Sequence, residues 1–199
     1  MSHIAIDGSA DAGAASESGH GGGSVSATGM WTFLATDAMG FGGLLAAYGV
    51  LRARAAAGAW PDPRSRLALA PAAAMTFALL TSSLTMTLAM RAPGTRERRR
   101  WLLATLALGV AFLAGGVAEY AHLAGGASPM GFSSGLYAST FYALTGYHAL
   151  HVVAGVVGVA FMCRAKVKQQ ALETIALYWH FVDIAWMPIF TFIYLVPAR

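Results

Sequence analysis

The sequence contains a single cysteine and few charged side chains. Cys163 has no partner for an intrachain disulfide and cannot form a metal cage of several cysteines; we interpret it as a small hydrophobic residue. Only 11% of the residues are charged and 57% are hydrophobic, whereas globular domains average about one quarter charged residues. One soluble domain could not bury so much apolar surface, so a membrane is the expected solvent.

The first 28 residues lack the features of a secretory signal. They contain Gly, Ser, Ala and acidic residues, with no basic segment and no apolar stretch. Such a composition cannot bury enough apolar surface to fold, so residues 1–28 are expected to form a disordered tail. His3 and His20 lie in this tail without companion ligands, and we do not expect them to bind a metal.

Five long apolar segments follow the tail. Each is long enough to cross about 30 Å of hydrocarbon at about 1.5 Å per residue. Backbone groups in lipid must be hydrogen-bonded within their own segment, so each segment is expected to be a helix. The predicted fold is all-α: one multi-pass domain, residues 29–199, with five transmembrane helices. The predicted helices are residues 29–51, 68–90, 101–124, 133–162 and 174–196.

Basic residues between the segments predict the orientation. The side that holds the N-terminus has eight of them and the opposite side has five. The positive-inside rule then places the N-terminus in the cytoplasm and the C-terminus outside. Membrane topology therefore explains the net charge of +4, and no nucleic-acid partner is expected.

Ionisable residues within the apolar segments are the main chemical clue, because a charge in lipid is costly and such residues usually have a function. Counting the helical rise predicts two layers of these side chains. The inner layer would contain Asp37, His151, His180 and Asp183, and the outer layer would pair Glu119 with His148.

Three interpretations of these residues remain open from the residues alone. The spacings Glu119-x-x-His122 and His148-x-x-His151 are compatible with a metal site, although a di-iron site needs further glutamates. Paired histidines could ligate a haem, using His180 with His148 or His151. The third interpretation, which we favour, is a structural polar network with a lipid or proton-path role. A transporter is not favoured, because no inverted repeat is evident.

Several motifs nevertheless resemble one family in order along the chain. The pattern Y-W-H-F-V-D-x-x-W at 178–186 resembles the closing helix of subunit III of the haem-copper respiratory oxidases. Residues 141–152 resemble its F-F-x-x-T-G-x-H-G-x-H-V pattern, with Ala149 in place of a glycine. Residues 31–41 resemble W-x-F-L-x-S-E-x-x-x-F, with Asp37 at the glutamate position.

One further motif departs from the family pattern. Glu119-Tyr120 resembles the family's Q-x-x-E-Y/W, but Gly116 stands at the glutamine position. Any hydrogen bond that the glutamine makes is therefore missing here. The whole chain after the tail is similar to the five-helix form of the family, which lacks the first pair of helices.

The resemblance implies an accessory subunit in aerobic electron transport, in a bacterial plasma membrane. Such a subunit binds no redox metal itself; haem and copper lie in its partners, the catalytic subunit I and subunit II. It holds phospholipid, supports proton uptake and protects the catalytic subunit during turnover, and the complex could join a larger respiratory supercomplex. Subunit III of a quinol oxidase, or an accessory protein of nitric oxide reduction, are the alternatives.

We accordingly expect no catalytic, cofactor-binding or metal-ligating residue on this chain. The expected network residues, which would support lipid binding or proton entry, are Asp37, Glu119, His148, His151, His180 and Asp183. Tyr178 and Trp179 lie near the predicted cytoplasmic end of the last helix, where aromatic side chains often anchor a protein at the headgroups.

Overall fold

The computed structural model describes residues 21–56, 60–61, 67–126, 129–164 and 168–197, and this part of the chain is entirely helical apart from its connections. All five long helices are long and apolar enough to cross a membrane, which confirms the predicted all-α membrane fold. They are α1 (Gly21–Arg54), α3 (Leu69–Arg91), α4 (Thr95–Gly125), α5 (Leu136–Arg164) and α6 (Gln169–Phe190), and a π-helical turn, η1 (Thr191–Leu195), ends the bundle.

Three helices begin earlier than the apolar pattern predicts. Helix α1 begins at Gly21, so residues 21–28 are helical, although they were predicted to belong to a tail without structure; residues 1–20 lie outside the described part. Helix α4 begins at Thr95 and α6 at Gln169. The reason is that an existing helix gains one hydrogen bond for each residue added, so it extends beyond its apolar segment.

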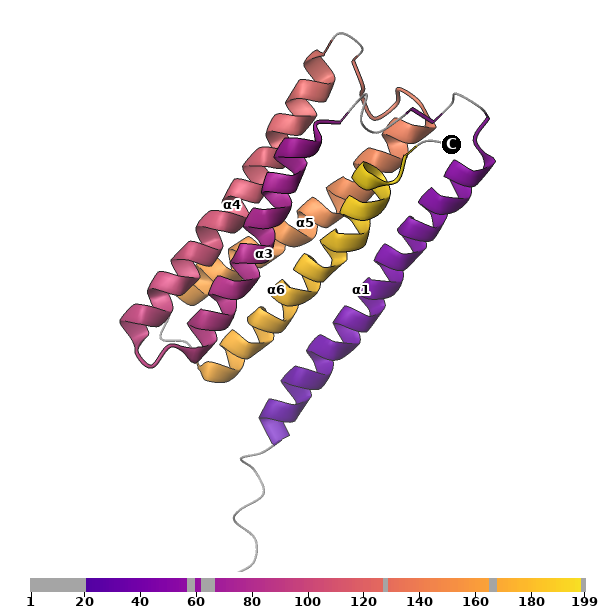
Figure 1. Ribbon diagram of the computed structural model, residues 1–199. Helices are drawn as coiled ribbons and strands as arrows, with labels where there is room; N and C mark the ends of the chain where they lie inside the picture. The colour runs from indigo at the N-terminus through magenta and orange to yellow at the C-terminus, as the bar shows by residue number, and fades with distance from the viewer. Residues whose placement is uncertain (1–20, 57–59, 62–66, 127–128, 165–167, 198–199) are drawn as a thin grey trace, which may run out of the picture.

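Helix α6 lies at the centre of the bundle (Figure 1). It packs against α1, α3 and α5, while α3 and α4 form a hairpin on one side of it. Helix α1 lies on the other side and packs mainly against α6 and α5. Its outward face carries exposed apolar side chains, Trp31, Phe33 and Met39 among them. In a membrane, such a face contacts lipid or another protein.

The indole of Trp179 occupies the centre of one half of the core. It lies between α4 and α5, where a Cβ atom at Gly109 would stand 2.6 Å from its Cη2 atom and one at Gly155 would stand 2.9 Å from its Cε3 atom. Any larger residue would therefore collide with the ring. The two glycines allow a bulky aromatic side chain to fill the space between three helices.

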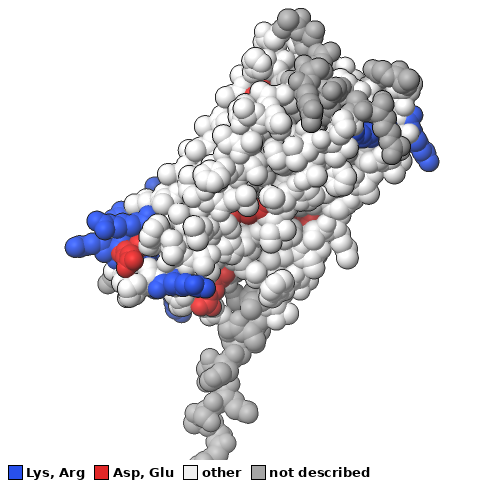
Figure 2. Space-filling model, in the orientation of Figure 1, with Lys and Arg blue, Asp and Glu red and all other residues white. Residues whose placement is uncertain are grey.

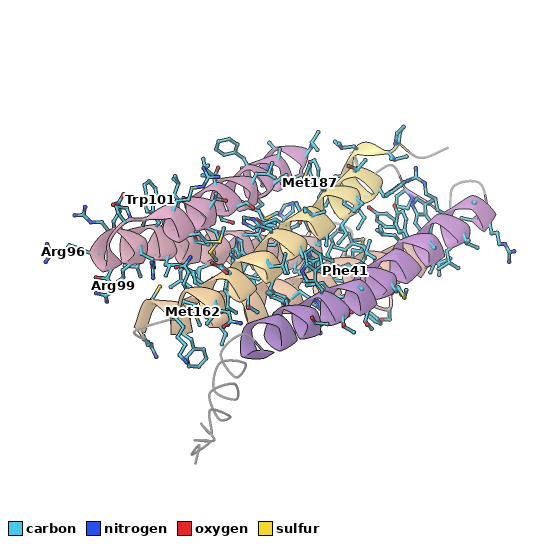
Figure 3. The ribbon with its side chains drawn as sticks, turned by 90° about the horizontal axis from the view of Figure 1, so that it is seen from below. Phe41, Arg96, Arg99, Trp101, Met162 and Met187 are labelled. Carbon is cyan, nitrogen blue, oxygen red and sulfur yellow. The ribbon has the colours of Figure 1, made fainter. Side chains whose placement is uncertain are left out.

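Lysine and arginine side chains gather at the ends of the bundle, and the band between them is uncharged except for small acidic patches (Figure 2). We call the end with the α3–α4 turn the basic end; its described basic residues are Arg91, Arg96, Arg98, Arg99, Arg100, Arg164 and Lys168. Figure 3 shows Arg96 and Arg99 near the start of α4. The run 96–100 was predicted to lie in a connection, but it forms the first turns of α4. Long basic side chains there can reach the membrane surface.

The end of α6 is held by α1. Pro188 lies inside α6 and cannot donate a backbone hydrogen bond; three residues later the chain enters η1. Arg52 donates to the carbonyl oxygens of Phe192 (3.4 Å) and Val196 (3.2 Å) and also contacts that of Pro197. Tyr48 donates to Phe192 as well, at 3.2 Å. These bonds satisfy carbonyl groups that a helix end leaves free.

Candidate functional site

Asp37 of α1 and His151 of α5 form an ion pair inside the bundle. His151 Nε2 lies 3.1 Å from Asp37 Oδ1, and the Tyr147 hydroxyl donates to the same oxygen at 2.8 Å. His151 Nδ1 lies 2.8 Å from the Tyr147 carbonyl oxygen. A carbonyl only accepts, so Nδ1 carries a proton. The Nε2–Oδ1 contact is an ion pair when the imidazole is protonated.

The surroundings of this pair exclude most solvent. Asp37 is 8% exposed, and the Phe41 ring centre lies 5.2 Å from that of His151. The Tyr178 hydroxyl donates to the His151 carbonyl oxygen at 3.0 Å, which links α6 to the pair. Figure 3 shows Phe41 on the side of α1 that faces the other helices. Side chains of α1, α5 and α6 thus meet at the Asp37–His151 pair.

His180 and Asp183 belong to a different group, on the face of α6 that meets α3. His180 Nδ1 lies 2.6 Å from the Ser83 hydroxyl oxygen. Asp183 is 3% exposed; Ser83 is its polar neighbour, but neither carboxyl oxygen completes a hydrogen bond of good geometry within the described part. The predicted single inner layer is therefore wrong. Helix α6 packs against α1 and α3 at once, and it separates the two groups.

The predicted pairing of Glu119 with His148 is also wrong. Glu119 Oε2 instead accepts a hydrogen bond of 2.6 Å from Tyr194 of η1. His148 is fully buried, and its ring lies 4.9 Å from Trp186 and 5.7 Å from Phe112, measured between ring centres. Neither of its nitrogens has a hydrogen-bond partner in the described chain. The turn η1 brings Tyr194 to Glu119, and no pattern in the sequence foretells that turn.

Tyr178 and Trp179 lie in the core rather than at the headgroups. Trp179 is only 1% exposed, and its indole N–H donates to the Ser82 hydroxyl at 3.0 Å. Tyr178 is buried with its hydroxyl on His151. The prediction that these two side chains anchor the protein at the headgroups is therefore wrong. Trp179 is buried because the glycines of α4 and α5 leave room for its indole.

Sequence reasoning missed the hydroxyl partners of the site. Tyr147, Tyr194, Ser82 and Ser83 each bond to one of the residues discussed above. Adjacent serines in an apolar segment are a usable signal, because a buried hydroxyl needs a partner. The tyrosines gave no separate signal, since they read as ordinary apolar side chains.

The described residues contain no group of three or more His, Cys, Asp or Glu side chains that could hold a metal ion. The candidate ligands point to different neighbours: Glu119 to Tyr194, His151 to Asp37 and His180 to Ser83. The arrangement provides hydrogen bonds and one ion-pair contact between helices.

Comparison with known proteins agrees with the motifs. The family described as "Cytochrome c oxidase subunit III" matches residues 23–197. The chain is 38% identical to the "Probable cytochrome c oxidase subunit 3" of Nocardia farcinica, over 82% of this chain and 84% of the relative. It is 34% identical to the protein of the same name from Mycobacterium tuberculosis H37Rv, over 84% and 86%.

A more distant relative shows the same coverage. The "Cytochrome c oxidase subunit 3" of Thermostichus vulcanus is 32% identical, over 84% of this chain and 86% of the relative. Together with the helical membrane bundle, these matches confirm the resemblance that the motifs suggested: the chain belongs to the cytochrome c oxidase subunit III family.

Proposed function

We propose that this chain is the accessory subunit III of a cytochrome c oxidase in aerobic electron transport. The observation that carries this proposal is the family match over residues 23–197, together with relatives named as subunit 3 of cytochrome c oxidase. In this proposal, the chain flanks the catalytic subunit I beside subunit II. Those partners hold the haem and copper groups, which carry out electron transfer and oxygen reduction.

The chain's own contribution is a set of polar contacts that holds the bundle together beside the catalytic subunit. Asp37, His151 and Tyr147 join α1 to α5, and Tyr178 extends the contact to α6. Because a buried carboxyl and a largely buried imidazole lie 3.1 Å apart, we propose that the pair has a supporting role in proton uptake. Glu119 with Tyr194 and His180 with Ser83 form separate contacts. In this proposal they support the neighbouring subunit too, as do His148 and Asp183, whose side chains have no hydrogen-bond partner of good geometry among the described residues.

Phospholipid is the proposed small-molecule partner. Exposed apolar side chains on α1, such as Met39, offer a surface for acyl chains, and the arginines of the basic end offer charges for phosphate groups. We place the basic end in the cytoplasm of a bacterium, with the chain's N-terminus there and its C-terminus outside. In a larger supercomplex, exposed apolar faces such as that of α1 would contact the neighbouring complexes.

A quinol oxidase is the second candidate, because Asp37 replaces the glutamate of the family pattern and quinol-oxidase members can carry aspartate there. A copper site in subunit II would indicate cytochrome c as the electron donor and its absence would indicate quinol, so this chain does not choose between the two. An accessory role in nitric oxide reduction is distinguished by the gas that the complex consumes.

The test is purification of the complex through an affinity tag on this chain. We expect a large haem- and copper-bearing subunit to copurify, and the complex to consume oxygen with reduced cytochrome c as donor. Consumption with quinol but not with cytochrome c would support the second candidate. A haem absorption band on the isolated chain, or the lack of any copurifying haem protein, would contradict the proposal.

A further inference from the structure

A cavity of about 230 Å³ lies between α4 and α5, which are adjacent helices in Figure 1. Its walls include Gly116, Glu119 and Tyr120 of α4, Thr145 of α5, and Trp186 and Tyr194 behind them. Val117 and Val153 also line it, and both are exposed on the surface of the bundle. The cavity is therefore open to the membrane side of the protein.

Gly116 leaves part of this space open. A Cβ atom built at this position meets no atom within 4 Å. A larger side chain at 116 would therefore extend into free space without a collision at its first atom. This provides a way to fill the cavity without disturbing the packing of the helix.

Most polar side chains that line the cavity already make hydrogen bonds to protein groups. The Tyr194 hydroxyl donates to Glu119 Oε2 at 2.6 Å, and the Trp186 indole N–H donates to Thr76 at 2.9 Å. Thr145 donates to the Phe141 carbonyl oxygen at 2.7 Å. Because a hydroxyl has one proton, the 2.7 Å contact between Tyr120 and Thr145 must use the proton of Tyr120.

Every side-chain donor on the walls discussed above is thus already committed, while one acceptor is free. Glu119 Oε1 has no hydrogen-bond partner among the described residues. Leaving a buried acceptor unpaired is unfavourable, and hydrogen bonds to charged groups are stronger than neutral ones. With Glu119 ionised, the cavity favours a ligand that donates a hydrogen bond over a ligand that can only accept one.

We propose that this cavity binds an apolar molecule with a single hydrogen-bond-donating head, an alcohol or an amine, whose head contacts Glu119 Oε1. An engineered apolar cavity of about 150 Å³ already holds a benzene molecule, so the larger volume here suffices for the apolar body of such a ligand. Ethers, ketones and phosphodiesters are disfavoured, because they have no proton to place between their acceptor oxygens and the Glu119 carboxylate oxygen.

The test uses photoaffinity labelling of the full chain within its purified complex in lipid nanodiscs. The probes are four chains that carry the same alkyl diazirine and differ only in the head: alcohol, amine, methyl ether and methyl ketone. Peptide mass spectrometry locates the label. We expect the alcohol and the amine to label the walls of the cavity about tenfold more than the ether and the ketone, as loss of one hydrogen bond to a carboxylate predicts.

Two variants provide the control for position. Gly116→Leu fills the cavity and should abolish this labelling, whereas Gly42→Leu, at an exposed glycine of α1 with equally open space, should leave it unchanged. Equal labelling by all four probes, or labelling that survives Gly116→Leu, would overturn the proposal. If Gly116→Leu does not assemble, competition on the unaltered chain decides: excess decanol should block labelling and decyl methyl ether should not, and equal effects of the two would refute the proposal.

Discussion

Asp37 Oδ1 accepts the Tyr147 hydroxyl at 2.8 Å and also lies 3.1 Å from His151 Nε2. One oxygen atom of α1 therefore meets two side chains of α5 that are one helical turn apart. Helix α1 packs mainly against α5 and α6, so this contact is a main polar attachment of α1 to the bundle.

Replacing Asp37 should weaken that attachment. In Asp37→Ala, His151 and Tyr147 lose their partner inside the bundle, and removal of one member of a buried ion pair typically costs about 3–5 kcal/mol. We expect the complex to assemble but to lose activity faster during turnover and to melt at a lower temperature. The measurements are oxygen consumption followed over time and thermal unfolding in detergent.

Asp37→Glu is the matched control for this experiment, because it keeps the acid and adds one methylene. It should retain most of the turnover lifetime. A normal lifetime and normal lipid content in Asp37→Ala would count against the supporting role of the pair.

Tyr194→Phe should be more harmful than Tyr120→Phe. Tyr194 donates to a carboxyl oxygen of Glu119, whereas Tyr120 donates to the hydroxyl of Thr145. Bonds to charged groups contribute about 1.5–3 kcal/mol and neutral ones about 0.5–1.5 kcal/mol. Comparing the melting temperatures of the two variants tests this order, and an equal or reversed effect would show that the Glu119 contact has no special strength.

Gly109→Ala should destabilise the protein although alanine favours helices. A Cβ atom there would lie 2.6 Å from the Trp179 ring, and overpacking costs about 1–3 kcal/mol, more than the gain of about 1 kcal/mol in helix propensity. Thermal unfolding measures the loss. Gly49→Ala, at a glycine of α1 with open space around it, should be neutral or stabilising.

A second change in the same place separates crowding from other causes. Trp179→Leu shortens the side chain that the new methyl group meets, so Gly109→Ala should cost less in that background. A cost that is unchanged by Trp179→Leu would mean that the ring is not what Gly109 accommodates.

The proposed orientation can be tested by cysteine labelling in a Cys163→Ser background. Gly94→Cys lies at the basic end and Ala53→Cys near the opposite end of α1, and both positions are exposed. With the basic end in the cytoplasm, a membrane-impermeant maleimide added to intact cells should label position 53 and reach position 94 only after lysis. The reverse pattern would invert the topology.

The sequence predicted the membrane fold well, because the signals for it are local. A helix in lipid needs only enough apolar residues in a row, so five segments were found, with ends that differ mainly where polar residues extend the helices. The motif around 178–186 likewise identified the family, which the comparison over residues 23–197 confirms. The six ionisable residues were visible because charged groups in apolar segments are rare.

The partners of those residues were decided by the tertiary structure alone. A helical rise predicts how deep a side chain lies, but not which neighbouring helix it faces. His180 therefore met Ser83 on α3 instead of Asp37, and Glu119 met Tyr194, which the turn η1 brings to it. Depth follows from counting residues along one helix, whereas partners depend on the rotation and packing of several helices at once, and that information lies in the three-dimensional arrangement.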